Sequence, residues 1–290
     1  MTYLIGIDAG GTKCRARLTS ADGVVLGEAE TGAANARIGV QKLSERICSV
    51  TDSVLEAAKL PRSALSETYM GLGIAGISRP GMRDLVENIQ FPVRAFLVET
   101  DAAIANFGAH KGRDGAILII GTGSIGHIRI GGVVTTMGGY GFPISDEGSG
   151  AALGLSAMRH ALRALDGRTK PTPLSASIMN RFKNSTAEAI AWMDGAVPRD
   201  YALLAPLVMD FAEQDDEIAR SIVEDAVRHI ERFIESIFAK GAPNCALVGG
   251  LAPRYKPWLR ERTVAQLCEP LGDPLDGALY LATLSANRAS

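Results

Sequence analysis

The sequence predicts an α/β protein of two similar domains, each a mixed sheet with flanking helices, with a cleft between the domains. Residues 3–17, YLIGIDAGGTKCRAR, and residues 116–130, AILIIGTGSIGHIRI, share one pattern: an apolar segment, a loop of Gly and Thr or Ser, and an alternating run. Alternation of apolar residues with period two predicts a strand after each loop. Strands then alternate with helical segments, which favours mixed sheets covered by helices. The length of 290 residues fits about two domains.

The first half opens with a strand meander and continues with alternating helices and strands. The Ala21-Asp22-Gly23 turn joins two of the opening strands. The segment 40–59 carries apolar residues on one helical face and is followed by Pro61, which is typical of a helix end. The predicted strands are Tyr3–Asp8, Lys13–Ser20, Val24–Ala29, Tyr69–Ile74 and Val93–Glu99, and the predicted helices are Val40–Lys59, Pro80–Asn88 and Ala102–His110.

The strand pattern restarts at Gly115, so we expect domains over residues 1–110 and 111–290. A long Gly-rich segment, 138–150, cannot pack as a core element and must have a local role. The predicted strands are Ala116–Ile120, Gly126–Ile130, Val133–Met137 and Cys245–Val248, and the predicted helices are Ala151–Leu165, Thr172–Phe182, Thr186–Asp194, Arg199–Glu213, Asp216–Lys240 and Asp276–Ala286.

Composition excludes several classes of partner. The net charge of −2 leaves no basic footprint for nucleic acid or an anionic membrane. The N-terminal residues lack the cationic region of a signal peptide, and no apolar stretch has the length and character of a membrane span. Four cysteines far apart, without a CxxC pair, indicate free thiols. We therefore expect a cytoplasmic protein without nucleic acid or membrane partners.

The two Gly loops are candidates for phosphate binding. Gly10-Gly11-Thr12 and Gly121-Thr122-Gly123-Ser124 each let backbone N–H groups approach an anion. Residues 121–126 also match GxGxxG, the dinucleotide fingerprint, but that fingerprint needs a helix after the glycines and here a strand follows. A plain hairpin turn is the alternative. No GxxxxGK[ST] motif is present, which excludes a P-loop.

Two carboxylates stand at predicted strand ends, where ligands usually bind in an α/β sheet. Asp8 ends the first strand beside the first Gly loop and is a candidate outer ligand of Mg²⁺, with a turn residue as the alternative. Asp101 lies between a strand and a helix. It is a candidate general base for a substrate hydroxyl, and an N-cap role is the alternative.

Further polar residues suit a hydroxyl-rich ligand. Asp146 and Glu147 precede a helix, and either they cap it or they hold sugar hydroxyls. Asn35 has both a donor and an acceptor, although alone it reads as a turn residue. Gly249-Gly250 after a strand either admits a flat base or makes a tight turn. Lys13 and Arg15 are expected to be solvated strand residues.

These residues resemble a known family. IDAGGTKCRARL, GTGSIG and SDEGSGAALG resemble the sugar kinases of the sugar kinase and actin superfamily, and more narrowly the glucosamine kinases and N-acetylglucosamine kinases of the BadF/BadG/BcrA/BcrD ATPase family. ETDAAIANFGAH and GGYGFPISDEGSG are similar to bacterial glucosamine kinases. The resemblance covers almost the whole chain and implies two ribonuclease H-like (actin-like ATPase) domains whose cleft closes on substrate. It also implies that the last helix of the chain can pack back on the first domain.

The resemblance also implies roles for individual residues, with ATP and Mg²⁺ as cofactors, an amino sugar as acceptor and a homodimer as the assembly. Asp101 would be the catalytic base on the sugar 6-hydroxyl, and Asp8 would lie near Mg²⁺. The implied phosphate and nucleotide residues are Asp8, Gly10, Gly11, Thr12, Gly121, Thr122, Gly123, Ser124, Gly249 and Gly250. The implied sugar-contacting residues are Asn35, Gly76, Asp101, Gly139, Tyr140, Gly141 and Asp146.

Two departures bear on the acceptor. Animal N-acetylglucosamine kinases carry an aromatic residue where this chain has Arg37, and a Ser where it has Ala75. Both weaken the case for an N-acetyl pocket and leave the amino sugar itself undecided. We expect glucosamine as the acceptor, with N-acetylglucosamine as the alternative. An activator ATPase of a dehydratase is less favoured because no cysteine is placed to ligate an iron–sulfur cluster. A non-catalytic sugar sensor is less favoured because Asp101 and both Gly loops are intact.

Overall fold

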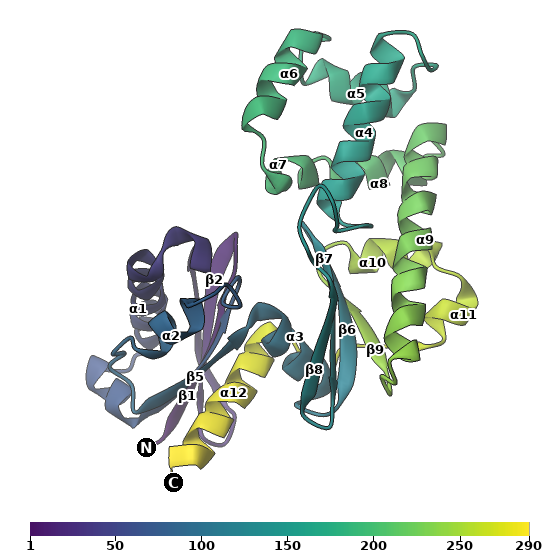
Figure 1. The fold of residues 1–290 in the computed structure, drawn as a ribbon. Coiled ribbons are helices and arrows are strands. Elements are labelled where there is room, and N and C mark those ends of the chain that lie inside the picture. Colours follow the sequence, from purple (N-terminus) through teal and green to yellow (C-terminus); the bar gives the residue numbers. More distant parts are fainter. Residues whose placement is uncertain (290) are drawn as a thin grey trace. The chain divides into compact units, whose positions relative to one another are not determined.

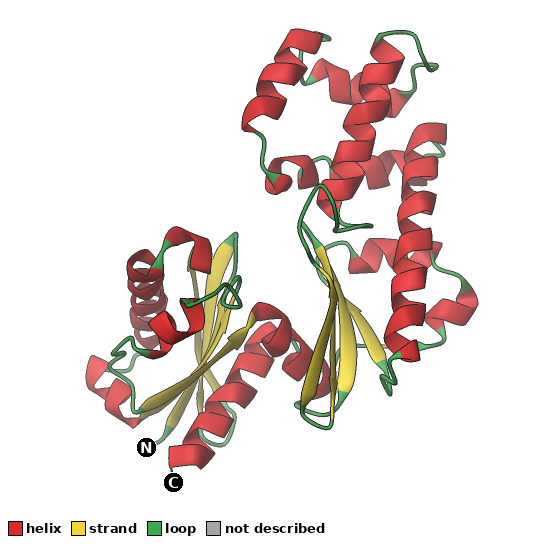
Figure 2. Cartoon of the chain, in the orientation of Figure 1, coloured by secondary structure: helices red, strands yellow, loops and turns green. Residues whose placement is uncertain are grey.

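The computed structural model describes residues 1–289 of the protein. It contains two compact units, one formed by Met1–Asp114 with residues 269–289, the other by Gly115–Cys268. Each unit is built on a five-stranded sheet with flanking helices (Figures 1 and 2). The predicted α/β class with two mixed sheets is therefore confirmed.

The sheet of the first unit combines a hairpin meander with parallel strands, in the order β3-β2-β1-β4-β5. The strands are β1 (Tyr3–Ala9), β2 (Lys13–Ser20), β3 (Val25–Gly32), β4 (Thr68–Ile74) and β5 (Ala95–Thr100). β2 pairs antiparallel with β1 and β3, whereas β4 lies parallel to β1 and β5. The carboxyl ends of β1, β4 and β5 consequently meet at one edge, where α/β sheets usually bind ligands.

Helices cover both faces of this sheet (Figure 1). The amphipathic helix α1 (Val40–Ala57) packs its buried side, including Leu43, Ile47 and Val50, against the side chains of Ile5 and Ile7 in β1. The opposite face is covered by α3 (Asp101–His110) and α12 (Pro274–Ala289). Shorter elements are η1 (Ala36–Ile38), η2 (Arg62–Glu67) and α2 (Met82–Glu87).

The C-terminal helix, α12, packs on the first unit because two neighbouring glycines leave part of that sheet without side chains. Gly6 and Gly71 are neighbours in the parallel pairing of β1 and β4. A Cβ atom on Gly71 would lie 2.0 Å from the backbone oxygen of Ala278 in α12, and one on Gly277 would lie 1.7 Å from the oxygen of Ile104 in α3. The helix therefore packs backbone against backbone. The second unit ends at Cys268, so it is shorter than the expected range of 111–290, whose last helix we expected to be able to pack back on the first domain.

A partly buried arginine holds the start of this helix through ion pairs. Arg17 of β2 forms ion pairs with Asp273 at 2.9 Å and with Asp276 at 2.6 Å, and also pairs with Glu28. Its side chain is only 15% exposed, and its carboxylate partners raise the pKa of the guanidinium against the effect of burial. Partial burial makes such a pair stronger than a surface one.

The second unit repeats the topology of the first. Its sheet order, β10-β9-β6-β7-β8, again has the first strand in the centre, a meander on one side and parallel strands on the other. The strands are β6 (Gly115–Ile120), β7 (Ser124–Ile130), β8 (Val133–Gly138), β9 (Cys245–Val248) and β10 (Leu267–Cys268). The repeat predicted from the two Gly loops thus extends to the whole sheet.

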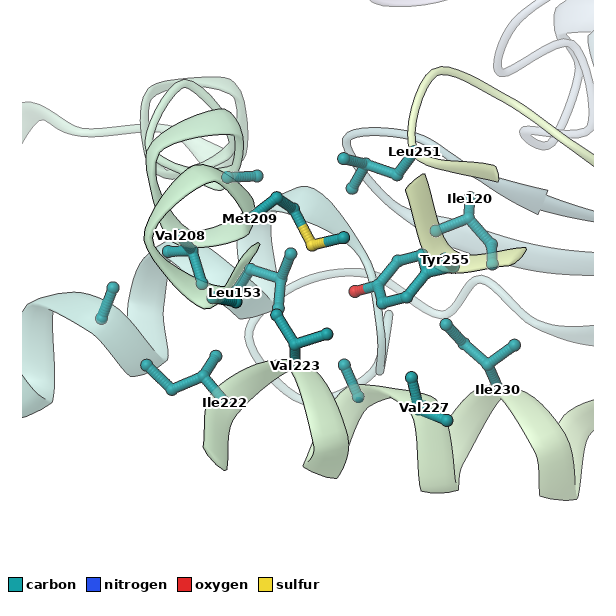
Figure 3. Close-up of a cluster of buried hydrophobic side chains, with 14 of the residues drawn as sticks. Ile120, Leu153, Val208, Met209, Ile222, Val223, Val227, Ile230, Leu251 and Tyr255 are labelled. Carbon is teal, nitrogen blue, oxygen red and sulfur yellow. The ribbon is translucent and has the colours of Figure 1, made fainter. Parts of the chain in front are cut away.

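A large helical layer covers this second sheet. The apolar side of α9 packs in one core with residues of β6 and of α4 (Figure 3). Figure 3 also shows Tyr255 of α10 within this core, close to Val223 and Ile230 of α9. The helices are α4 (Gly150–Leu165), α5 (Pro173–Asn180), α6 (Thr186–Gly195), α7 (Pro198–Ala202), α8 (Ala205–Glu213), α9 (Glu217–Ala239), α10 (Ala252–Tyr255), α11 (Glu261–Val264) and the 3-10 turn η3 (Lys256–Trp258).

The predicted single helix over 199–213 is wrong. The chain forms α7 and α8 instead, with a break at Leu203 and Leu204. Pro206 explains the break, because a proline ring inside a continuous helix would clash with the carbonyl group four residues earlier, at Ala202. At the second position of α8 the same proline is tolerated, because a backbone N–H at this position would have no partner within the helix.

Short elements near the C-terminal end of the second unit were not predicted: β10, α10, α11 and η3. Two to four residues are too few to show a period. Across residues 1–289, no helix combines the length and the apolar character that crossing a membrane requires.

Candidate functional site

The first Gly loop turns tightly at the carboxyl end of β1. The N–H of Gly10 donates to the carbonyl of Lys13 at 3.0 Å, and the carbonyl of Gly10 accepts from Ala34 at 3.0 Å. A Cβ on Gly11 would meet nothing closer than the Asn35 amide nitrogen, at 3.8 Å. The loop is therefore fixed by its own backbone while the surface at Gly11 and Thr12 stays exposed.

Asp8 is held by an arginine across the hairpin. The two residues face each other in the β1–β2 pairing, and the Arg15 guanidinium lies 2.6 Å from a carboxylate oxygen of Asp8. The Asp8 side chain is 17% exposed and that of Arg15 is 38% exposed. The expectation that Arg15 is simply solvated is wrong, because the antiparallel register places it opposite Asp8. Lys13, in contrast, forms an exposed ion pair with Glu30.

Asp101 is the first residue of α3, directly after β5. The N-cap is Thr100, whose hydroxyl accepts from the N–H of Ala103 at 2.9 Å. The N-cap alternative for Asp101 is therefore wrong. Its carboxylate accepts a local hydrogen bond from the N–H of Ala102 at 3.0 Å. Burial raises the pKa of Asp101; the Ala102 hydrogen bond opposes this, and the charge of Asp8 adds to it. Asp101 and Asp8 thus act on each other electrostatically at the same edge of the sheet.

Asn35 and Gly76 lie at this edge too. Asn35 caps η1, and its side-chain oxygen accepts from the N–H of Arg37 at 2.9 Å. The alternative that Asn35 is a turn residue is therefore confirmed. Its amide nitrogen faces the first Gly loop, as the approach to Gly11 shows. Ala75, which precedes Gly76, donates to the carbonyl of Ala9 and accepts from the N–H of Ala36. The first unit therefore brings Asp8, the Gly loop, Asn35, Gly76 and Asp101 to one corner.

The second Gly loop occupies the equivalent place after β6. The N–H of Gly121 donates to the carbonyl of Gly123 at 2.9 Å. The carbonyls of Gly121 and Thr122 accept from Gly150 and Ala151, which ties the loop to the first turn of α4. A Cβ on Gly121 would meet nothing within 4 Å, so this side of the loop is open.

Asp146, in the Gly-rich segment 138–150, contacts the second Gly loop. Its carboxylate accepts from the N–H of Ser124 at 3.4 Å, and its oxygens lie 3.0 and 3.2 Å from the position that a Cβ on Gly123 would take. The side chain of Ser124 is also engaged, because its hydroxyl donates to the carbonyl of Glu147 at 2.8 Å. Burial raises the pKa of Asp146, which is 9% exposed.

The rest of the Gly-rich segment is partly anchored and partly free. Tyr255 donates its hydroxyl to the carbonyl of Gly148 at 2.8 Å, and the Phe142 ring packs against Tyr201 at 5.0 Å between centroids. Gly139 lies against Ile125, whereas Tyr140 is 80% exposed. One end of the loop is thus fixed to the core, and the part with Gly139, Tyr140 and Gly141 faces solvent.

Gly249 and Gly250 follow β9 and reach the same corner of the second unit. Gly249 has a φ of 101°, and a Cβ there would lie 2.4 Å from the carbonyl oxygen of Ile120, the residue before the second Gly loop. Only glycine accepts both conditions. Gly250, in contrast, has open space around its Cβ position. The tight turn therefore lies directly beside the phosphate-loop candidate.

The residues present fit a nucleotide and its metal. Gly11, Gly121 and Gly250 leave backbone surface open, as a polyphosphate and a flat base require. Asp8 offers the oxygen ligand that Mg²⁺ prefers. Residues 1–289 contain no group of three or more His, Cys, Asp or Glu that could hold a metal ion. A Mg²⁺ ion that keeps its waters and binds phosphates with one carboxylate needs no such group.

Comparison with known proteins identifies the relatives of this chain. The BadF/BadG/BcrA/BcrD ATPase family matches residues 5–282. A glucosamine kinase of Vibrio cholerae is 36% identical over 97% of this chain and 96% of its own length. An N-acetylmuramic acid/N-acetylglucosamine kinase of Clostridium acetobutylicum is 29% identical over 82% of this chain and 79% of its own.

A solved structure agrees with the sequence relatives. A Chromobacterium violaceum protein assigned as an N-acetylglucosamine kinase superposes with a TM-score of 0.91 at 33% identity, covering 97% of this chain and 99% of that one. The resemblance inferred from the motifs is confirmed, and this chain belongs to the BadF/BadG/BcrA/BcrD ATPase family.

Proposed function

We propose that the protein transfers the γ-phosphoryl group of ATP to the 6-hydroxyl of an amino sugar, with glucosamine as the acceptor. The Vibrio cholerae relative, a glucosamine kinase, matches over almost the whole of both chains. The Clostridium and Chromobacterium relatives are kinases of amino sugars as well. The family is one of ATPases, which supports ATP as the phosphoryl donor.

The observation that carries the proposal is the position of Asp101. Its carboxylate stands at the carboxyl end of a parallel strand, is partly buried, and accepts a local hydrogen bond from the N–H of Ala102. Burial raises its pKa, which makes the ionised form a stronger base. In the proposed reaction Asp101 accepts the proton of the 6-hydroxyl as that oxygen attacks the γ-phosphorus and ADP leaves.

The two Gly loops supply the phosphate contacts. The first loop, with Gly10, Gly11 and Thr12, and the second, with residues 121–124, would donate backbone N–H groups to the phosphates. Mg²⁺, when bound, neutralises charge that develops on the phosphate oxygens. Asp8 would hold that ion through water, which requires Arg15 to share or release the carboxylate. Gly249 and Gly250 would lie against the adenosine.

The acceptor contacts come from both halves of the sequence. Asn35 and Gly76 lie at the corner that contains Asp101, and we assign them to sugar hydroxyls. Gly139, Tyr140, Gly141 and Asp146 are assigned to the same ligand. The homodimer expected from the family resemblance remains a prediction, which light scattering of the purified protein tests.

The direct test of the activity is a panel of acceptors. ADP release is measured with glucosamine, N-acetylglucosamine, N-acetylmannosamine and glucose, and the phosphate position of each product is read by NMR. The proposal predicts the highest kcat/KM for glucosamine and a 6-phosphate product. No sugar-dependent ADP release on any acceptor, with sugar binding retained, would support a non-catalytic sensor instead.

N-acetylglucosamine is the second candidate acceptor, favoured by the assignment of the Chromobacterium relative. Arg37 bears on the choice, because it stands where animal N-acetylglucosamine kinases carry an aromatic residue, and here it is exposed beside Asn35. Exchange of Arg37 for Trp should shift the kcat/KM ratio toward N-acetylglucosamine. If the wild-type enzyme already prefers N-acetylglucosamine, the glucosamine assignment is wrong and the kinase assignment stands.

A further inference from the structure

Asp146 occupies a place where the proposed reaction needs a phosphate. The second Gly loop is the phosphate-loop candidate of this unit, yet one of its N–H groups, that of Ser124, donates to the Asp146 carboxylate at 3.4 Å. The same carboxylate lies against the Cβ position of Gly123, with its carbon 3.1 Å away. A carboxylate on a backbone N–H of such a loop makes the contact that a phosphate oxygen would make.

The surroundings hold the carboxylate in this place. Asp146 is 9% exposed, and its backbone has a φ of 71°, a left-handed conformation that is uncommon outside glycine. Ser124 fixes the next residue of the segment, because its hydroxyl donates to the carbonyl of Glu147. Tyr255 fixes the residue after that, through the carbonyl of Gly148. The contact thus belongs to a network and is not a chance position of a free side chain.

A carboxylate and a phosphate cannot share this position without cost. Two negative charges about 4 Å apart repel one another strongly in a partly buried site, where the effective dielectric constant is about 20. ATP can therefore engage the Ser124 N–H fully only after the Asp146 carboxylate has left. An acceptor sugar can draw the Asp146 carboxylate away from the loop, because the carboxylate can accept hydrogen bonds from two sugar hydroxyls instead of one backbone N–H.

We propose that Asp146 holds the second phosphate loop until an acceptor sugar draws its carboxylate away, so that the sugar and ATP bind with positive cooperativity. The inference rests on the proposed function for the identity of the two ligands. Its consequence is that the enzyme without sugar binds ATP weakly, which limits hydrolysis of ATP by water. Asp146 acts here as a positioning residue that links the acceptor loop to the phosphate loop.

The test compares ATP affinity in the absence of sugar, by calorimetry with Mg²⁺ and a non-hydrolysable ATP analogue. Asp146→Asn removes the charge, keeps the shape, and suits a left-handed backbone, since Asn adopts this conformation more readily than most residues. We expect its affinity for the analogue to rise about tenfold over wild type, because the wild-type carboxylate must first give up its charge-assisted hydrogen bond with the Ser124 N–H. Asp146→Gly, which removes the side chain and any backbone strain, should show the same gain.

Glu147→Gln is the matched control, because it removes the same charge from the neighbouring residue, whose side chain is exposed. Its backbone carbonyl, the acceptor for Ser124, is unchanged. We expect less than about a twofold change in its affinity for the analogue, since exposed charges are well screened. A gain in affinity cannot arise from partial unfolding, so the result does not depend on equal stability of the variants.

The second measurement adds a sugar that cannot react, 6-deoxyglucosamine. In wild type it should raise the affinity for the ATP analogue, and in Asp146→Asn this increase should be lost. Equal or lower affinity of Asp146→Asn and Asp146→Gly without sugar would overturn the inference, as would a sugar-dependent increase that persists in both. Neither measurement needs turnover, so failure of the kinase activity itself would appear separately, in the acceptor panel.

Discussion

The close packing of α12 on α3 gives a prediction that links the fold to the site. A Cβ on Gly277 would lie 1.7 Å from the backbone oxygen of Ile104 and 2.6 Å from the nitrogen of Gly108. Gly277→Ala must therefore push α12 away from α3 by more than an ångström, because both opposing atoms belong to the backbone. Overpacking costs about 1–3 kcal/mol and rigid neighbours favour the upper end. Alanine returns about 1 kcal/mol through helix propensity, which leaves a net loss of about 2 kcal/mol.

Urea denaturation measures this loss, and Gly195→Ala is the control. Gly195 ends α6, and a Cβ there would meet nothing within 4 Å. The same substitution should thus leave the free energy of unfolding unchanged or raise it slightly. Because Asp101 begins α3, Gly277→Ala should also lower kcat, whereas Gly195→Ala should not. Equal stability of the two variants would refute the account of how α12 is held.

Three further predictions follow from the ion pairs and buried carboxylates. Arg17→Gln should lower the free energy of unfolding by about 1–2 kcal/mol in low salt and by less in 1 M salt, measured by urea denaturation, because the arginine is paired and mostly buried. Burial would raise the pKa of Glu231, but its hydrogen bonds with Arg260 lower it overall. The ionised Glu231 therefore adds to the free energy of unfolding at a pH above the ordinary carboxyl pKa, and this contribution is lost as the pH falls through the lowered pKa. Between pH 5 and pH 3 the melting temperature should thus fall less in Glu231→Gln than in wild type. The raised pKa of Asp101 should place the acid limb of kcat/KM above the value of about 3.9 of a free aspartate, and an acid limb below that value would contradict the base role.

Much of the fold could be predicted because the sequence patterns that indicate its strands and helices lie within short segments. Alternation on both sides of each Gly loop gave the two opening hairpins, and the apolar stripe from residue 216 to 240 gave α9, observed as Glu217–Ala239. The register of a tight hairpin is local as well. Ala9 and Cys14 form the innermost pair of the hairpin, and Asp8 and Arg15 are the next residues outward, so their pairing could have been predicted from the sequence.

Other features depend on contacts between residues far apart in the chain. The position of α12 depends on Gly6 and Gly71, which form one surface without side chains only when β1 and β4 pair in parallel. The contact of Asp146 with Ser124 joins residues 22 apart and needs a left-handed backbone at an aspartate, which no sequence pattern indicates. The sequence therefore predicted Asp146 as a functional residue but not the contact that it makes.

Asp101→Asn tests the central claim most directly. The substitution keeps the shape of the side chain and removes its ability to accept the 6-hydroxyl proton. Glucosamine-dependent ADP release should fall in kcat by about 10²–10⁴, the usual contribution of a general base, while the affinity for ATP stays within about twofold of wild type. Turnover close to that of the wild-type enzyme would contradict the assignment of Asp101 as the base and the phosphoryl-transfer mechanism built on it.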